Sequence, residues 1–149
     1  MNDKRYCGIE CVFSDAKQTA DFLRLLISHI NDGYFCIEDQ FVLSEGESTA
    51  FPEKLKAGEF RELLTPFVYV LSLVVHLYPS DAQNERIDTY EDYKKSRCEM
   101  IILIYDSAYL EVYCKSIELL DNLFKIAKMS AVTADKIYED TDDRTSMWV

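Results

Sequence analysis

Between residues 98 and 129 the spacing of apolar residues along the chain changes twice. We take this stretch as the centre of the predicted fold. Residues 100–105, MIILIY, form a continuous apolar run rich in β-branched side chains, which predicts a strand buried on both faces. After the turn-forming pair Asp106-Ser107, apolar and polar residues alternate over 109–114, as in a half-buried strand. Because so few residues separate them, the two strands should pair as an antiparallel hairpin.

From Ser116 onward the apolar residues recur at spacings of three and four, which predicts an amphipathic helix. Ser116 is a favourable N-cap, and Glu118 places negative charge in the first turn, where the helix dipole favours it. The apolar face of this helix must cover a sheet, and the preceding hairpin is the nearest candidate. That face consists of Ile117, Leu120, Leu123, Phe124 and Ala127.

The N-terminal part begins with a predicted strand over 6–13, in which Gly8 marks either a bulge or a close backbone approach. A helix is expected over 16–30, because its apolar residues share one face and an Asn-Asp-Gly sequence follows. Two short strands, 34–38 and 41–43, are then expected to form a hairpin about a polar pair of residues.

The middle of the chain contains the longest predicted loop, the polar segment 44–50, and then a short helix over 57–64. Residues 67–78, FVYVLSLVVHLY, fit either a buried helix or a long central strand. Their β-branched and aromatic content, with proline on both sides, favours the strand. A short helix over 90–96 precedes the central hairpin, and a last strand is predicted over 132–138.

The order of these elements contains more hairpins than crossovers. It therefore predicts an α+β fold with a mixed, mostly antiparallel sheet and helices packed mainly on one face. The tail, residues 144–149, fits either a final strand or a docked terminus. A length of 149 residues is typical of one domain, so we expect residues 1–149 to form a single domain.

Several motifs of the C-terminal part occur together: Thr-Tyr-Glu-Asp-Tyr before a Ser-x-Cys, an apolar strand ending at Asp106, Tyr-Cys-Lys at 113–115, and an acidic pair before Arg144 near Trp148. In residues 87–124 and the ending DDRTSMWV, the chain resembles a small family of uncharacterised proteins from bacilli and related Firmicutes. The resemblance implies a small cytoplasmic bacterial protein. It implies no activity, because the family has none assigned.

The net charge of −11 narrows the class of partner. It repels nucleic-acid phosphates and anionic membranes, so we expect neither as a partner. It attracts a basic protein and speeds the encounter with it, although solubility alone is an alternative reason for the charge. The chain shows no signal-peptide pattern and no apolar run of membrane-spanning length, which predicts a cytoplasmic location.

The sequence predicts neither a metal nor a cofactor. Its five cysteines, an odd number, fit buried thiols in a reducing compartment. Cys7 and Cys11 are spaced as zinc ligands can be, but two further ligands are missing; on a strand both would point to one face as small buried residues. Asp140, Asp142 and Asp143 resemble part of a calcium loop but lack its glycine and its final glutamate, so a solvated loop is expected.

No catalytic constellation is recognisable. His29 and His76 are the only histidines, and neither has a nucleophile or carboxylate motif around it. We expect packing or capping roles for both and assign no catalytic residue. The sequence therefore favours a binding protein over an enzyme.

The best candidate for a binding surface is the outer face of the 109–114 strand. Tyr109, Glu111 and Tyr113 alternate onto that face, where they would form an exposed aromatic and acidic patch. Tyrosine is enriched in binding interfaces, although ordinary core and boundary aromatics are the alternative interpretation.

A second group of binding candidates follows near the C-terminus: Asp142, Asp143 and Arg144. Arg144 fits either a structural ion pair that fixes the tail or a substrate contact.

These features predict a small acidic cytoplasmic binding protein, of the immunity or antitoxin kind that blocks a basic toxin domain. The alternative is a small-ligand-binding protein or an enzyme of unknown class, with its site in a cleft between the sheet and a helix. A homo-oligomer that forms through a sheet edge or the tyrosine face is a third hypothesis.

Overall fold

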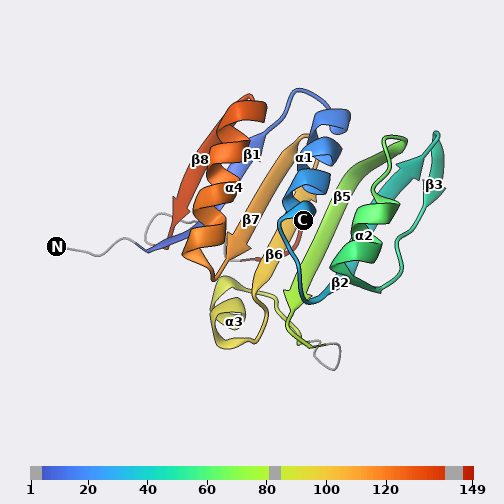
Figure 1. The fold of residues 1–149 in the computed structure, drawn as a ribbon. Helices are drawn as coiled ribbons and strands as arrows, with labels where there is room; N and C mark the ends of the chain where they lie inside the picture. The colour runs from blue at the N-terminus through green and yellow to red at the C-terminus, as the bar shows by residue number, and fades with distance from the viewer. Residues whose placement is uncertain (1–4, 81–84, 140–145) are drawn as a thin grey trace.

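The computed structural model describes residues 5–80, 85–139 and 146–149, which form a sheet and four helices (Figure 1). In chain order the elements are β1 (Tyr6–Val12), α1 (Ala16–Ser28), β2 (Tyr34–Ser44), β3 (Glu47–Thr49), β4 (Lys54–Lys56), α2 (Ala57–Leu63), β5 (Val68–Tyr78), α3 (Tyr90–Lys95), β6 (Met100–Tyr105), β7 (Tyr109–Cys114), α4 (Ile117–Ser130) and β8 (Thr133–Tyr138).

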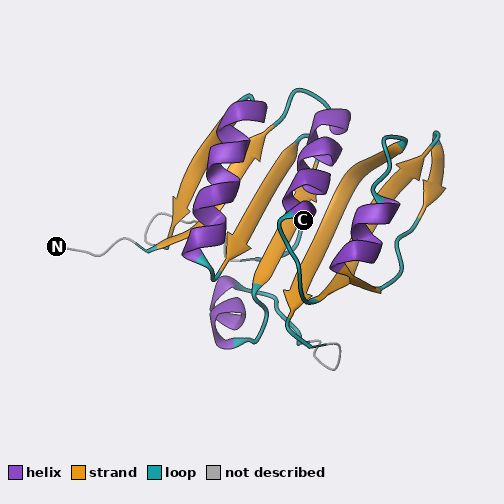
Figure 2. Cartoon of the chain, viewed as in Figure 1, coloured by secondary structure: helices purple, strands orange, loops and turns teal. Residues whose placement is uncertain are grey.

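The strands form one sheet in the order β3-β2-β5-β6-β7-β1-β8, and β4 pairs with β2 as well. Every strand pair among the described residues is antiparallel. Helices α1, α2 and α4 lie side by side on one face of the sheet, which we call the helix face (Figures 1 and 2). The predicted α+β class, with a mostly antiparallel sheet and helices mainly on one face, is confirmed.

The central unit forms as the sequence predicts, because its patterns are local. Along β6, Ile102 and Ile104 join the core under the helices, while Ile101 and Leu103 join a second core on the other side of the sheet. The turn to β7 places Asp106 at a φ of 50°, a left-handed conformation that aspartate tolerates. Helix α4 begins at its predicted cap, where the Ser116 side chain accepts a hydrogen bond from the Leu119 N–H at 3.2 Å.

The predicted hairpin within residues 34–43 is wrong, because β2 is one strand that pairs with β5 from Tyr34 to Ser44. Two register shifts along this pair accommodate the polar residues 38–40 without ending the strand. The Gln40 side chain also bonds both backbone groups of Phe51, at 2.7 and 3.0 Å. The long strand over 67–78 is confirmed as β5, whereas the expected loop 44–50 is largely strand: it contains the end of β2, a two-residue turn and β3.

Strand β1 contains the bulge that Gly8 predicts, since its register against β8 shifts between Tyr6 and Gly8. A Cβ atom on Gly8 would lie 2.6 Å from the carbonyl oxygen of Val112, so the close backbone approach is present too. All five cysteines are free and buried, as predicted. The expectation that Cys7 and Cys11 share a face is wrong, because the bulge places Cys7 in the second core.

Replacing Gly8 by alanine should destabilise the protein by roughly 1–3 kcal/mol, because the added methyl group meets the Val112 carbonyl oxygen, a backbone atom fixed in the paired strand β7. Urea unfolding followed by circular dichroism measures the change. Gly58→Ala in α2 is the matched control, since the nearest atom there is the end of the Arg61 side chain at 3.8 Å. Alanine also favours a helix, so the control should be neutral or stabilising. Equal stability of Gly8→Ala and the natural protein would contradict the close approach.

The face of the sheet away from α1, α2 and α4, called here the opposite face, is covered only in part. Ile87, Tyr93 of α3 and Met147 pack there against the second core. The tail is a docked terminus rather than a strand, because the Met147 N–H donates to the Asp88 carbonyl at 2.8 Å. The indole N–H of Trp148 donates to the Asp88 carboxylate at 3.1 Å.

Within the three described ranges, no helix is both long and apolar enough to cross a membrane.

Candidate functional site

The predicted patch on β7 is only partly at the surface. Tyr109 is 42% exposed, but Glu111 and Tyr113 are 5% and 0% exposed. The expectation that all three form an exposed patch is therefore wrong for Glu111 and Tyr113. Tyr113 packs against Tyr90 of α3, with ring centroids 5.8 Å apart, and its hydroxyl donates to Glu111 at 3.0 Å. Alternation along β7 identified the face, but it carried no information on what covers that face.

The other predicted binding residues, Asp142, Asp143 and Arg144, lie outside the described residues, as does Asp140.

A group of aromatic side chains, three of them exposed and Tyr105 half-buried, does lie on the opposite face, at the end of the sheet away from α3. We define the aromatic face as Phe41, Tyr69, Tyr105 and Tyr109. Tyr105 and Tyr109 face each other across β6 and β7 and stack, with centroids 5.3 Å apart and an interplanar angle of 6°. Beside them is a hollow of about 430 Å³, lined by Asp39, Phe41, Leu71, Ser72, Tyr105, Asp106, Ser107 and Val149.

A second hollow, of about 460 Å³, adjoins the first. It is lined by Glu38, His76, Glu85, Arg86, Ile87 and Trp148. The two hollows are neighbours because Glu38 and Trp148 line one, while the next residues in the chain, Asp39 and Val149, line the other.

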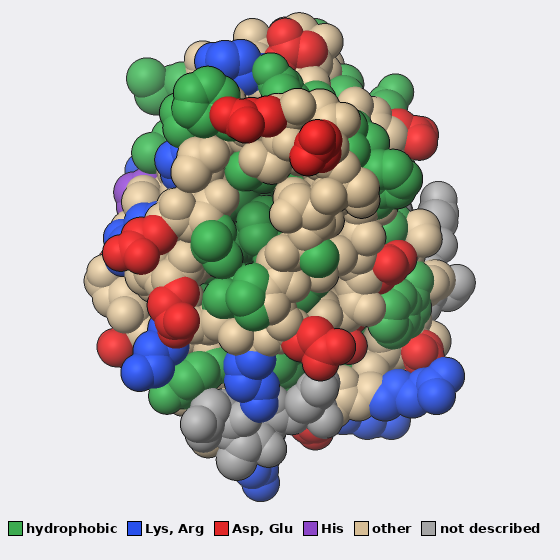
Figure 3. Space-filling model, turned by 90° about the vertical axis from the view of Figure 1, so that its right-hand side faces the viewer, with side chains coloured by type: hydrophobic (Ala, Val, Ile, Leu, Met, Phe, Trp, Pro, Cys, Tyr) green, Lys and Arg blue, Asp and Glu red, His purple; other side chains and the backbone are tan. Residues whose placement is uncertain are grey.

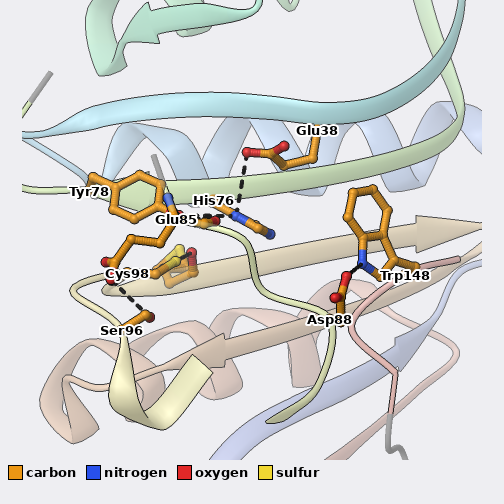
Figure 4. Close-up of polar contacts among 9 residues, drawn as sticks. Glu38, His76, Tyr78, Glu85, Asp88, Ser96, Cys98 and Trp148 are labelled. Carbon is orange, nitrogen blue, oxygen red and sulfur yellow. Dashed lines mark hydrogen bonds and ion pairs between the residues drawn. The ribbon is translucent and has the colours of Figure 1, made fainter. Parts of the chain in front are cut away.

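His76 is the most deeply buried polar group of this second hollow, at 1% exposure. Its Nδ1 atom lies 3.3 Å from the Tyr78 hydroxyl and 3.6 Å from a Glu38 carboxylate oxygen. Figure 4 shows the imidazole with this nitrogen toward Glu38 and the other nitrogen toward the side where Trp148 lies. The pairing of β2 with β5 brings these groups together, since Cys36 and His76 are in register.

The hydrogen bonds of Tyr78 determine which nitrogen of His76 carries the proton. The Tyr78 hydroxyl donates to the Glu85 carbonyl at 3.2 Å and accepts from the Glu85 N–H at 3.1 Å. Its only proton is thereby used, so Nδ1 must be the donor in its contact with that hydroxyl. The Nε2 atom is left as a lone-pair acceptor.

Among the described residues, neither Nε2 of His76 nor Oε1 of Glu38 has a hydrogen-bond partner, since the Nδ1 atom near Oε1 is beyond hydrogen-bond distance at 3.6 Å. Burial lowers the pKa of His76 to about 4, so the ring is neutral at pH 7. Burial also raises the pKa of Glu38, and the nearby charge of Glu53 raises it further. Among the described residues, no cluster of three or more His, Cys, Asp and Glu side chains could hold a metal ion.

A third hollow, of about 610 Å³, lies beside α3 and is lined in part by Arg5, Tyr90, Lys94 and Glu139. The Tyr90 hydroxyl donates to Glu139 at 2.8 Å, and Lys94 pairs with Glu91 at 3.0 Å. Because Tyr90, Glu139 and Lys94 already have partners, we consider the hollow at His76 the better candidate for a ligand site.

The His76 hollow was missed at the sequence level because the wrong hairpin in residues 34–43 separated Glu38 from its neighbours on β5. One signal was present: His76 is a lone ionisable residue inside an apolar run. A strand pairing was needed to reveal its partners.

Comparison with known proteins connects this architecture to a family. Residues 25–148 match the family model described as protein of unknown function (DUF2691). The uncharacterized protein YncE of Bacillus subtilis (strain 168) is 26% identical over 104 residues, which cover 69% of this chain and 63% of that relative. The matched part thus spans less than two thirds of the relative's length. No solved structure matches the chain.

The family match extends the resemblance that the C-terminal motifs predict, because it begins within α1 and includes Glu38, His76 and Trp148. The predicted relationship to uncharacterised proteins of bacilli is confirmed. The chain belongs to the DUF2691 family of proteins of unknown function.

Proposed function

We propose that this protein is a cytoplasmic binding protein that recognises a basic protein partner through the aromatic face. The observation that carries the proposal is the exposure of Phe41, Tyr69 and Tyr109, with the half-buried Tyr105 beside them, on the face of the sheet opposite to α1, α2 and α4. An immunity protein or antitoxin that blocks a basic toxin domain is the specific form of this function that we favour.

The aromatic face has the chemistry of an interaction surface. Tyrosine and phenylalanine provide large contact areas with few rotatable bonds, and an apolar group of this kind is unusual on a surface that stays in water. Tyr105 and Tyr109 are already stacked, so their side chains lose little freedom when a partner binds. The rings also present faces on which lysine or arginine side chains can lie.

Charge supports a basic partner. Asp39 and Asp106 line the hollow beside the aromatic rings. On the same face of the sheet, the exposed residues Glu10 and Asp135 are in register across β1 and β8. Seen from the β3 edge, acidic side chains are interspersed with hydrophobic ones (Figure 3). A net charge of −11 also disfavours association with a second copy of the chain.

Alanine substitution at Phe41 and Tyr109 together should abolish binding to a basic partner. Truncating an aromatic hot-spot residue near the centre of an interface costs about 2 kcal/mol or more of binding free energy. Candidate partners come from bacilli lysates and from purified toxin domains, and calorimetry with the purified partner measures the affinity. Binding should also weaken steeply as salt is added.

Leu63→Ala is the control, because Leu63 is exposed on α2 of the helix face. It should leave the affinity unchanged. A partner that is acidic, or one whose affinity survives the double substitution, would contradict the proposal. Light scattering provides a separate outcome: a dimer that the double substitution dissociates would assign the aromatic face to self-association instead.

The cytoplasmic location belongs to the same proposal. Five free and buried thiols fit a reducing compartment, where no oxidant joins them.

A further inference from the structure

We propose that the hollow at His76 binds a small organic ammonium group, with Nε2 of His76 and the carboxylate of Glu38 as acceptors and the indole of Trp148 as a wall. This site is separate from the aromatic face and does not depend on protein binding there. It lies between two strands and the docked tail, on the opposite face of the sheet.

The unmet hydrogen bonds determine the polarity of the ligand. Nε2 of His76 and Oε1 of Glu38 are both acceptors, and both are buried without a donor. Buried polar groups are normally paired, so a pair of orphaned acceptors in one hollow indicates a missing donor. A primary ammonium carries three N–H donors and can serve both atoms, whereas an anion brings only further lone pairs.

The charges around the hollow favour a cation. Glu38 and Glu85 both line it, and Arg86 is the only basic side chain among its described lining residues. The Arg86 guanidinium is paired with Asp88 at 2.8 Å, and its side chain is 86% exposed, so it points into solvent rather than neutralising Glu38. An entering cation would therefore meet a carboxylate that forms no ion pair with a lysine or arginine among the described residues.

The remaining walls suit the hydrocarbon part of an amine. Ile87 and the indole of Trp148 line the same hollow, and an indole ring attracts cations over its face. Because Nε2 has no contact with solvent, we expect the ligand to enter by displacing the Trp148 side chain. The indole N–H donates to the Asp88 carboxylate at 3.1 Å, and the side chain packs at the border of the second core.

A metal ion and a structural water molecule are the competing occupants. A metal would need more ligands, and the described residues offer no cluster of three. A single water could donate to both acceptors, as buried waters commonly do. A titration distinguishes a bound water from a bound amine, since only binding of the amine makes the signal depend on amine concentration.

The test is a titration of the full chain with n-butylammonium chloride at constant ionic strength and neutral pH. Trp148 is the only tryptophan, so its fluorescence reports on the wall of the hollow directly. With two histidines in the chain, the ¹⁵N signals of the His76 ring can be assigned and followed as well. We expect a saturable fluorescence change together with a shift of the Nε2 signal.

Tetramethylammonium chloride is the matched ligand control, because it carries the same charge without an N–H donor. It should give no saturable response. Glu38→Gln should weaken n-butylammonium binding about tenfold or more, since it removes a charged acceptor while keeping the side-chain shape. Glu62→Gln removes an exposed carboxylate of α2 on the helix face, which does not line the hollow, and it should leave the affinity nearly unchanged. Circular dichroism of each variant verifies folding.

Three results would overturn the proposal. An equal response to tetramethylammonium would show charge attraction without the assigned hydrogen bonds. Equal binding by Glu38→Gln and the natural protein would remove Glu38 from the site. The absence of any saturable change up to about 100 mM amine would leave a structural water as the occupant. None of these results bears on protein binding by the aromatic face, which is tested with different residues.

Discussion

Replacing Met147 by alanine should destabilise the folded protein by roughly 2–5 kcal/mol, the usual cost of truncating a buried methionine. Met147 is 0% exposed and packs into the second core, two residues before Val149. Its backbone N–H is tied to the Asp88 carbonyl at 2.8 Å, so the tail has little freedom to collapse into the cavity left behind. Urea unfolding followed by circular dichroism at neutral pH measures the change.

Met129→Ala provides the matched control, because Met129 is 88% exposed near the end of α4. We expect its effect to stay within about 0.5 kcal/mol. If Met147→Ala behaves like Met129→Ala, the tail does not contribute to the core and the docked terminus is disproved. The tryptophan of the tail gives a second measure, since Met147→Ala should also loosen Trp148 and shift its emission.

Acidification should destabilise the protein between pH 6.5 and about 4 through His76. The pKa of His76 is lowered from 6.5 to about 4, so in this interval the unfolded chain binds a proton that the folded chain does not. Stability must then fall as the pH falls, and the loss attributable to this one ring amounts to roughly 3 kcal/mol at the acid end. Urea unfolding at several pH values measures the slope.

Other groups around the ring titrate too, so the His76 contribution is measured as a difference. Glu38 acts in the opposite direction, because its raised pKa makes the folded state the better proton acceptor. The remaining neighbours are Tyr78, Glu85 and Arg86. The contribution of the ring is the slope of the unfolding free energy against pH for the natural protein minus the same slope for His76→Gln. His29→Gln, at the exposed C-cap of α1, should keep the natural slope. Equal slopes for the natural protein and His76→Gln would refute the assignment.

Much of the fold could be predicted because it depends on local patterns. The run MIILIY, the turn at Asp106, the alternation after it and the Ser116 cap all lie within neighbouring residues. Each formed the predicted element, although β7 is buried on both faces rather than half-buried. The ambiguous run 67–78 was resolved by composition alone, since β-branched and aromatic side chains favour a strand.

The predictions that were wrong concern residues whose structure depends on contacts with segments distant in the sequence. The polar residues 38–40 look like a turn, but β5 pairs along the whole of β2 and keeps the strand intact. Cys7 and Cys11 would share a face in a regular strand, but the close approach of Val112 to Gly8 accompanies a bulge that separates them. Glu111 and Tyr113 are buried because of segments that precede and follow β7 by many residues.

The residues of the candidate sites also differ in whether the local sequence could identify them. Tyr109 was identified because a surface tyrosine on an alternating strand is visible in the sequence. Its companions Phe41 and Tyr69 come from β2 and β5, and only the strand order brings them near. The same strand pairing creates the neighbourhood of Glu38 and His76. A site assembled from three or more strands is not encoded in any single window of residues.

The position of β1 in the strand order has a consequence for how the chain folds as it is synthesised. Both neighbours of β1, strands β7 and β8, come from the last third of the sequence: Cys11 pairs with Leu110 on one side and with Ala134 on the other. Pairings of such long sequence separation close late and slow the folding of a domain. While the ribosome translates residues 13–108, the apolar segment around Ile9 has no strand to pair with on either side. The first strand of the protein is therefore among the last to be secured, and until then its edges are the part of the nascent chain most in need of protection from aggregation.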